Sequence, residues 1–179
     1  MANILVEELK ALGIDNAYVD EKCFVYGKLA ATPGYENAVK LGFIAHMDTV
    51  SDFCDHDTTP VITENYNGED LVLGASGRVL SVKDFPHLPS LKGRTLITTD
   101  GTTVLGADDK AGIAEIMTML ERIQKEEIPH GKISVAFTPD EEAGSGVNHF
   151  NVKDFDAEFA YTMDGGPEGE IQYEKFQCM

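Results

Sequence analysis

The sequence predicts an α/β fold, with helices on the faces of a parallel or mixed β-sheet. Short apolar runs rich in β-branched residues are typical of buried strands, and a long amphipathic helix separates two groups of them. With 179 residues, 42% of them hydrophobic, the chain is also long enough to bury a core of its own.

Two helices are expected. Apolar residues at helical spacing run from Ile4 to Leu12, and Gly13 ends the pattern, so a short amphipathic helix opens the chain. The clearest helix covers 110–127, where isoleucine, methionine and leucine side chains form one stripe and Pro129 follows.

Several segments between turn signals are expected to form strands. In chain order these are 23–29, 41–46, 61–64, 71–73, 95–99, 133–138, 159–163 and, near the end, 171–176. The segments 133–138 and 159–163 are expected to be buried, and 74–92, which is punctuated by Gly, Ser and Pro, is expected to be a loop.

The chain is strongly acidic, with 14 basic and 31 acidic residues and a formal net charge of −17. This charge excludes nucleic acid and anionic lipid as electrostatic partners. No apolar run reaches the roughly 18 residues of a membrane span, and no signal-peptide pattern opens the chain, so we expect a cytoplasmic protein. The cysteines are odd in number and unpaired in spacing, so reduced thiols are expected at Cys23, Cys54 and Cys178.

Polar residues that can carry chemistry stand directly after three of the predicted strands. They are His46 at the end of 41–46 with Asp48 beyond it, Glu141 and Glu142 after 133–138, and Asp164 after 159–163. Ligands of open α/β sheets bind outside the carboxyl ends of the strands, so these side chains are expected on one rim of the sheet.

Asp108 and Asp109 add to this set from the start of the long helix, whose dipole favours carboxylates there. Strand alternation lets His46 and Asp48 meet while Met47 enters the core. One imidazole, oriented by one carboxylate and surrounded by others, suits a zinc centre. Without a cation, the clustered acids would raise one another's pKa values.

Each feature taken alone also has an ordinary structural explanation. A His-x-Asp at a strand end is commonly a polar terminus, and paired acids commonly favour a helix N-terminus or form a solvated turn. The combination at the strand ends favours a metal centre. The other histidines are expected in surface or capping roles: His56, His87, His130 and His149. No phosphate-binding loop, nucleophile elbow or dinucleotide fingerprint is present.

Four motifs follow one another along the chain, at 46–49, 106–112, 138–142 and 163–165. In order and spacing they resemble those of the M20 metallopeptidases, and the stretch 96–117 is similar to the tripeptide aminopeptidases of that family. The resemblance covers nearly the whole chain. It implies a three-layer α/β/α, zinc-exopeptidase-like catalytic domain with a mixed, mostly parallel sheet.

The same resemblance implies two zinc ions in a complete active site. His46, Asp108 and Asp164 would hold one zinc, and Asp108 would bridge to a second zinc that Glu142 also binds.

Catalytic roles also follow from the resemblance. Asp48 would orient His46, and Glu141 would be the general base that activates water. A cis peptide bond is implied between Asp108 and Asp109.

Members of the family are much longer than this chain. The chain is therefore expected to be one incomplete catalytic domain over 1–179, without the dimerisation or lid domain and without the C-terminal half, which carries the last His ligand. On this basis the fragment is expected to be inactive and to bind zinc only partially. The full-length protein is expected to form a homodimer through the missing domain.

The function expected from the resemblance is release of the N-terminal residue from tripeptides, with a small peptide as substrate. One alternative is another M20 hydrolase, such as a dipeptidase or an N-acyl amino acid deacylase. The other alternative is a non-catalytic metal-binding module.

Overall fold

The computed structural model describes residues 1–166 and 169–172. The chain divides into two compact units, one made of Met1–Asp48 with Asp108–Met179 and the other of Thr49–Ala107. The sequence analysis treated 1–179 as one incomplete domain and did not anticipate this division. The units are described separately below. The strand expected at 171–176 lies mostly outside the described residues, as does Cys178, whereas Cys23 and Cys54 are exposed free thiols.

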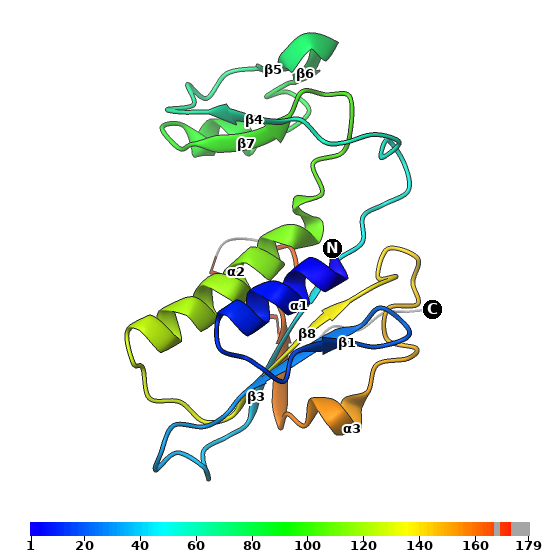
Figure 1. Ribbon diagram of the computed structural model, residues 1–179. Helices are drawn as coiled ribbons and strands as arrows, with labels where there is room; N and C mark the ends of the chain where they lie inside the picture. Colours follow the sequence, from blue (N-terminus) through cyan, green and yellow to red (C-terminus); the bar gives the residue numbers. More distant parts are fainter. Residues whose placement is uncertain (167–168, 173–179) are drawn as a thin grey trace. The chain divides into compact units, whose positions relative to one another are not determined.

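The first unit is built on a five-stranded sheet of order β1-β2-β8-β3-β9 (Figure 1). Its strands are β1 (Tyr18–Val19), β2 (Val25–Leu29), β3 (Leu41–His46), β8 (Ile133–Thr138) and β9 (Phe159–Thr162). β3 pairs in parallel with β8 on one side and with β9 on the other, while β2 is antiparallel to both β1 and β8. Two of the four strand pairings described are parallel, which confirms a mixed sheet that includes parallel strands.

One face of the sheet is covered by the two helices that the sequence predicted, α1 (Ala2–Ala11) and α2 (Ala107–Lys125). Leu9 of α1 and Leu120 of α2 are completely buried in the same core as Val135 and Phe137 of β8. The side chain of Met47 is partly buried against this core, as strand alternation predicted.

The opposite face carries an aromatic cluster and the short helix α3 (Val152–Phe155). Tyr26 and Phe155 are buried here beside Ala136, since alternate residues of a strand point to opposite faces. Helices on both faces confirm the layered α/β arrangement. The sequence analysis did not identify α3, which is only one turn long.

β9 corrects one expectation. The segment 159–163 was expected to be a buried strand, but all four residues of β9 are exposed, and Phe159 retains 62% of its accessible surface. Among the described residues β9 pairs with β3 alone, so it is an edge strand. The apolar composition of 159–163 is typical of a buried strand, but composition alone does not distinguish a buried strand from an exposed edge strand.

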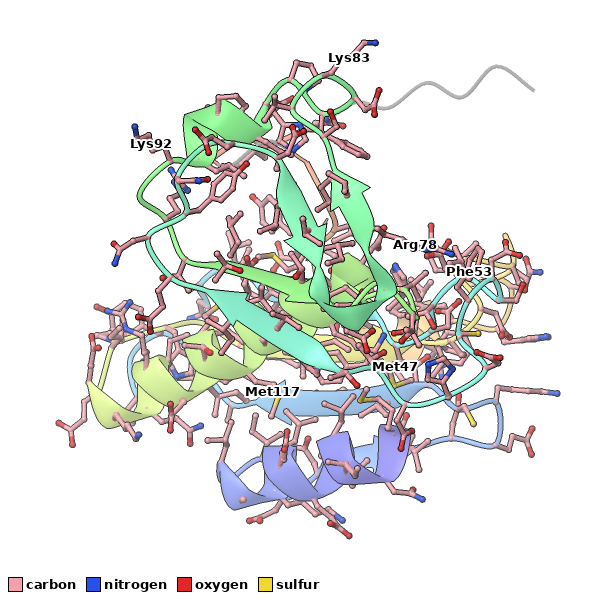
Figure 2. The ribbon with its side chains drawn as sticks, turned by 90° about the horizontal axis from the view of Figure 1, so that it is seen from above. Met47, Phe53, Arg78, Lys83, Lys92 and Met117 are labelled. Atoms are coloured by element: carbon pink, nitrogen blue, oxygen red, sulfur yellow. The ribbon has the colours of Figure 1, made fainter. Side chains whose placement is uncertain are left out.

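The second unit consists of short antiparallel pairs. β4 (Pro60–Thr63) pairs with β7 (Leu96–Thr99), and β5 (Leu71–Leu73) pairs with β6 (Arg78–Leu80). β6 and the 3₁₀ turns Gly74–Ser76 and Leu88–Leu91 lie in the segment 74–92, so the expectation of a loop there was wrong. Figure 2 shows Arg78 beside Phe53, with its guanidinium 4.9 Å from the ring centroid.

In the residues that the structure describes, no helix has the length and apolar character needed to cross a bilayer.

Candidate metal centre

The predicted rim exists because β3, β8 and β9 run in the same direction. His46, the last residue of β3, is in register with Thr138, the last residue of β8. Glu141 and Glu142 follow shortly after β8, and Asp164 follows β9. The carboxyl ends of three neighbouring parallel strands thus deliver their side chains to one edge of the sheet.

His46 is the buried centre of this group, with only 3% of its surface exposed. Its Nε2 lies 2.8 Å from Oδ1 of Asp108 and 3.9 Å from Oε2 of Glu141. Its Nδ1 lies 3.1 Å from the carbonyl oxygen of Asp48 and 3.3 Å from Oδ1 of the same residue. One ring nitrogen is therefore held by Asp48, while the other faces carboxylates.

The electrostatic setting of His46 reflects competing effects. Burial lowers the pKa of His46, but the hydrogen bond with Asp108 and the charges of Asp48 and Asp108 raise it, and the net shift is upward. The carboxylates around the ring thus stabilise a positive charge at this point.

Among the residues that the structure describes, two groups of side chains could hold a cation. The first is His46, Asp108 and Asp164, and the second is His46, Glu141 and Glu142. Within each group the ligand atoms lie within 4.8 Å of one another. An imidazole with carboxylate oxygens is a donor set that zinc accepts, so the residues present fit such an ion. The structure groups Glu142 with Glu141 rather than with Asp108, the residue that was expected to share a second zinc with it.

Asp48 connects the end of β3 to the loop after β8. Its Oδ1 accepts the backbone N–H of Glu141 at 3.2 Å, and its Oδ2 accepts that of Glu142 at 3.0 Å. The same carboxylate lies beside Nδ1 of His46. This arrangement is the one in which a carboxylate fixes the orientation and tautomer of a ligating histidine.

The sequence analysis placed Asp109 among the clustered acids but gave it no role of its own. Asp109 is only 3% exposed, and its carboxylate accepts the backbone N–H of His46 and that of Gly112. Burial and the charge of Asp164 raise the pKa of Asp109 to about 6, against the effect of these N–H donors. Strand-end reasoning could not assign its role, because Asp109 follows no strand and directly precedes the regular part of α2.

Lys110 places a cation beside the acids. Its Nζ is buried and makes no hydrogen bond with the described residues. Burial lowers the pKa of Lys110 and outweighs the charges of Asp48, Asp108 and other nearby acids, which raise it, so the net shift is downward. Lys110 therefore offsets part of the negative charge of the site without forming a specific ion pair.

The backbone at the start of α2 agrees with the resemblance. The peptide bond between Asp108 and Asp109 is cis, as expected, and both residues depart from helical geometry, so the regular helix begins at Lys110. The other histidines take part in neither candidate group. His130 is half-buried, and the other three are exposed: His56, His87 and His149.

Comparisons with known proteins identify relatives of this chain. A model of the M42 glutamyl aminopeptidase family matches residues 89–177. The chain is 54% identical over 180 residues to a protein named Peptidase T from Geobacillus thermodenitrificans, an alignment that covers 99% of the chain. The chain is homologous to peptidase T. The alignment spans only 44% of the length of that relative.

Solved structures show the same relationship in the fold. A tripeptidase from Staphylococcus aureus superposes with a TM-score of 0.65 at 29% identity, covering 91% of this chain and 37% of that chain. An aminoacylhistidine dipeptidase from Vibrio alginolyticus gives a TM-score of 0.60 at 28% identity, covering 94% and 29% respectively. The expected exopeptidase-like fold and the resemblance to tripeptide aminopeptidases are therefore confirmed. The family model that matches is M42, whereas the sequence motifs resemble M20.

Proposed function

We propose that this chain supplies most of the metal site of a zinc-dependent aminopeptidase that releases the N-terminal residue from tripeptides. The observation that carries the proposal is a buried histidine shared by two groups of carboxylates, which come from the ends of parallel strands and from the start of α2. Homology to peptidase T and likeness to a tripeptidase support the choice of reaction.

The ligand roles are part of this proposal. His46, Asp108 and Asp164, which the structure brings together, would hold one zinc. The family resemblance implies Asp108 and Glu142 as ligands of a second zinc, although the structure groups Glu142 with His46 and Glu141. Bound zinc supplies a Lewis acid that polarises the scissile carbonyl.

Glu141 is proposed as the general base. Its side chain is 52% exposed and therefore accessible to water and to a peptide, and its Oε2 lies 3.9 Å from Nε2 of His46. In the reaction, the Glu141 carboxylate takes a proton from the attacking water and passes it to the leaving amine. Asp48 holds His46 and Glu141 in place, since its carboxylate contacts the His46 ring and accepts the backbone N–H of Glu141.

The activity is proposed for a protein that also contains the remainder of a peptidase T sequence. That remainder would provide a further histidine for the second zinc and a dimerisation domain, so the longer protein is proposed to be a homodimer. The 179-residue chain alone is expected to be inactive and to bind zinc only partially.

A dipeptidase is the second candidate, favoured by the likeness to the aminoacylhistidine dipeptidase. N-acyl amino acid deacylation and metal binding without catalysis are further outcomes of the test below.

The test joins residues 1–179 to the part of the Geobacillus thermodenitrificans relative that the alignment leaves uncovered. The fusion is assayed with zinc on a tripeptide, a dipeptide and an N-acyl amino acid. We expect preferential cleavage of the tripeptide at its first bond. Glu141→Gln should lower the rate by at least about 100-fold while zinc remains bound, since general-base catalysis contributes about 10²–10⁴-fold.

Each outcome decides between the candidates. Faster cleavage of the dipeptide or the acyl amino acid would select that alternative. A fusion that binds zinc and cleaves none of the substrates would establish a metal-binding module. Activity in the 179-residue chain alone would refute the proposal that the remainder is required.

A further inference from the structure

The ends of β3 and β9 meet the first turn of α2 around the side chain of Asp109. Oδ2 of Asp109 accepts the backbone N–H of His46 at 3.2 Å, and Oδ1 accepts the backbone N–H of Gly112 at 3.1 Å. This buried carboxylate therefore ties the backbone of His46 to the helix that begins beside Asp108. Asp109 belongs to neither candidate ligand group.

At Gly112, α2 lies close to the backbone of Met163, the residue that follows β9. A Cβ atom at this position would lie 2.0 Å from the carbonyl oxygen of Met163 and 2.5 Å from Oδ1 of Asp109. The backbone of Met163 cannot yield easily, because its N–H donates to the carbonyl oxygen of Ile44 in β3 at 2.8 Å. Only glycine permits this approach, and the next residue after Met163 is Asp164.

These contacts link the positions of the three ligands in the first candidate group. His46 is held through its backbone by Asp109, Asp108 is the preceding residue in the chain, and Asp164 follows the carbonyl that packs against Gly112. A methyl group at Gly112 would push the end of β9, and with it Asp164, away from α2.

We propose that Asp109 and Gly112 are positioning residues that set the spacing of His46, Asp108 and Asp164 and thereby the metal affinity of this group. The inference rests on the proposed metal site and adds two residues that determine its metal affinity without contributing a ligand atom. Groups that orient metal ligands commonly contribute about 10- to 100-fold to affinity.

The test uses a matched pair of glycine substitutions in the 179-residue chain. Gly112→Ala adds a methyl group against Met163, whereas Gly166→Ala adds one where nothing lies within 4 Å. The metal-free proteins are titrated with Zn²⁺ by calorimetry and with Co²⁺ by visible absorption, which reports the geometry of the ligands. We expect Gly112→Ala to weaken Zn²⁺ binding about 10- to 100-fold and to change the Co²⁺ spectrum. Gly166→Ala should leave both unchanged.

Asp109→Asn provides a second test that keeps the size of the side chain. An amide has one oxygen acceptor, and its NH₂ group would face an N–H donor of either His46 or Gly112. Asp109→Asn should also weaken Zn²⁺ binding. If circular dichroism shows that Gly112→Ala does not fold, the result for Asp109→Asn decides the question.

The outcomes separate this inference from the proposed function. If the unmodified chain binds Zn²⁺ and folded Gly112→Ala or Asp109→Asn binds equally well with the same Co²⁺ spectrum, the positioning role is wrong. If the unmodified chain binds neither ion, His46, Asp108 and Asp164 do not form a metal site in this chain and the inference is wrong, while the assays of the fusion protein still test the proposed function.

Discussion

β8 and β9 lie on opposite sides of β3, and both precede candidate metal ligands, but their surroundings differ. All six residues of β8 are buried, whereas all four residues of β9 are exposed. β8 has paired neighbours on both sides, and β9 pairs with β3 alone among the described residues. Parallel pairing with β3 is therefore sufficient to align the strand ends, and burial of the strand is not required.

The comparison predicts very different costs for equivalent truncations in the two strands. Phe137 of β8 has no exposed surface, so Phe137→Ala leaves a cavity and should lower the free energy of unfolding by about 3–5 kcal/mol. Urea denaturation followed by circular dichroism measures this change. A loss below about 1 kcal/mol would show that the β8 core is less closely packed than described.

A smaller effect is expected where β3 packs under α3. A Cβ atom on Gly42 would lie 2.5 Å from the ring of Phe155, so Gly42→Ala should cost about 1–3 kcal/mol through overpacking. Combining Gly42→Ala with Phe155→Leu should recover part of the loss, because the smaller side chain makes room. An additive loss in the double variant would mean that the clash is not its cause.

The attachment of α3 to the sheet should depend on pH. Hydrogen bonds from Lys28 and Tyr18 lower the pKa of Asp154 in the folded protein. The stability that ionised Asp154 contributes is therefore fully present above the pKa that Asp154 has in the unfolded chain. It is lost as the pH falls through the lower pKa of the folded state. Lys28→Met should therefore reduce stability at pH 7, by less than about 1 kcal/mol because the pair is partly exposed.

The stability difference between the unmodified protein and Lys28→Met should shrink as the pH falls below about 4, where Asp154 becomes protonated in the unfolded chain. Urea denaturation at pH 7 and pH 3 measures both differences. A difference that is constant across this range would exclude the ion pair as its cause.

The smallest effect is expected on β9. Phe159→Ala removes a side chain that is 62% exposed, so stability should change by no more than about 0.5 kcal/mol. The same urea measurement tests this value against Phe137→Ala. A loss comparable to that of Phe137→Ala would show that Phe159 is covered in solution, for example by a second copy of the chain.

The sequence predicted the parts of the molecule that depend on regular patterns. The stripe of α2, the strands β3 and β8, and the polar residues at their ends all follow from periodicity and the strand-end rule. β6 was not identified because Gly and Ser residues flank it on both sides, and α3 was not identified because four residues are too few to establish a helical period.

The candidate site, too, could be predicted from the sequence only in part. Side chains after strands could be listed from the sequence, but the role of Asp109 depends on two backbone N–H donors, one of which lies 63 residues away in the chain. The role of Gly112 likewise depends on the carbonyl of Met163, a contact that only the folded chain creates. No pattern local to either residue indicates these contacts.

Asp48 gives the site a property that a list of ligands does not convey. One carboxylate lies against the His46 ring and accepts the N–H groups of both Glu141 and Glu142. Since the imidazole belongs to both candidate groups, the one carboxylate of Asp48 joins the ring that the groups share to the loop that carries Glu141 and Glu142.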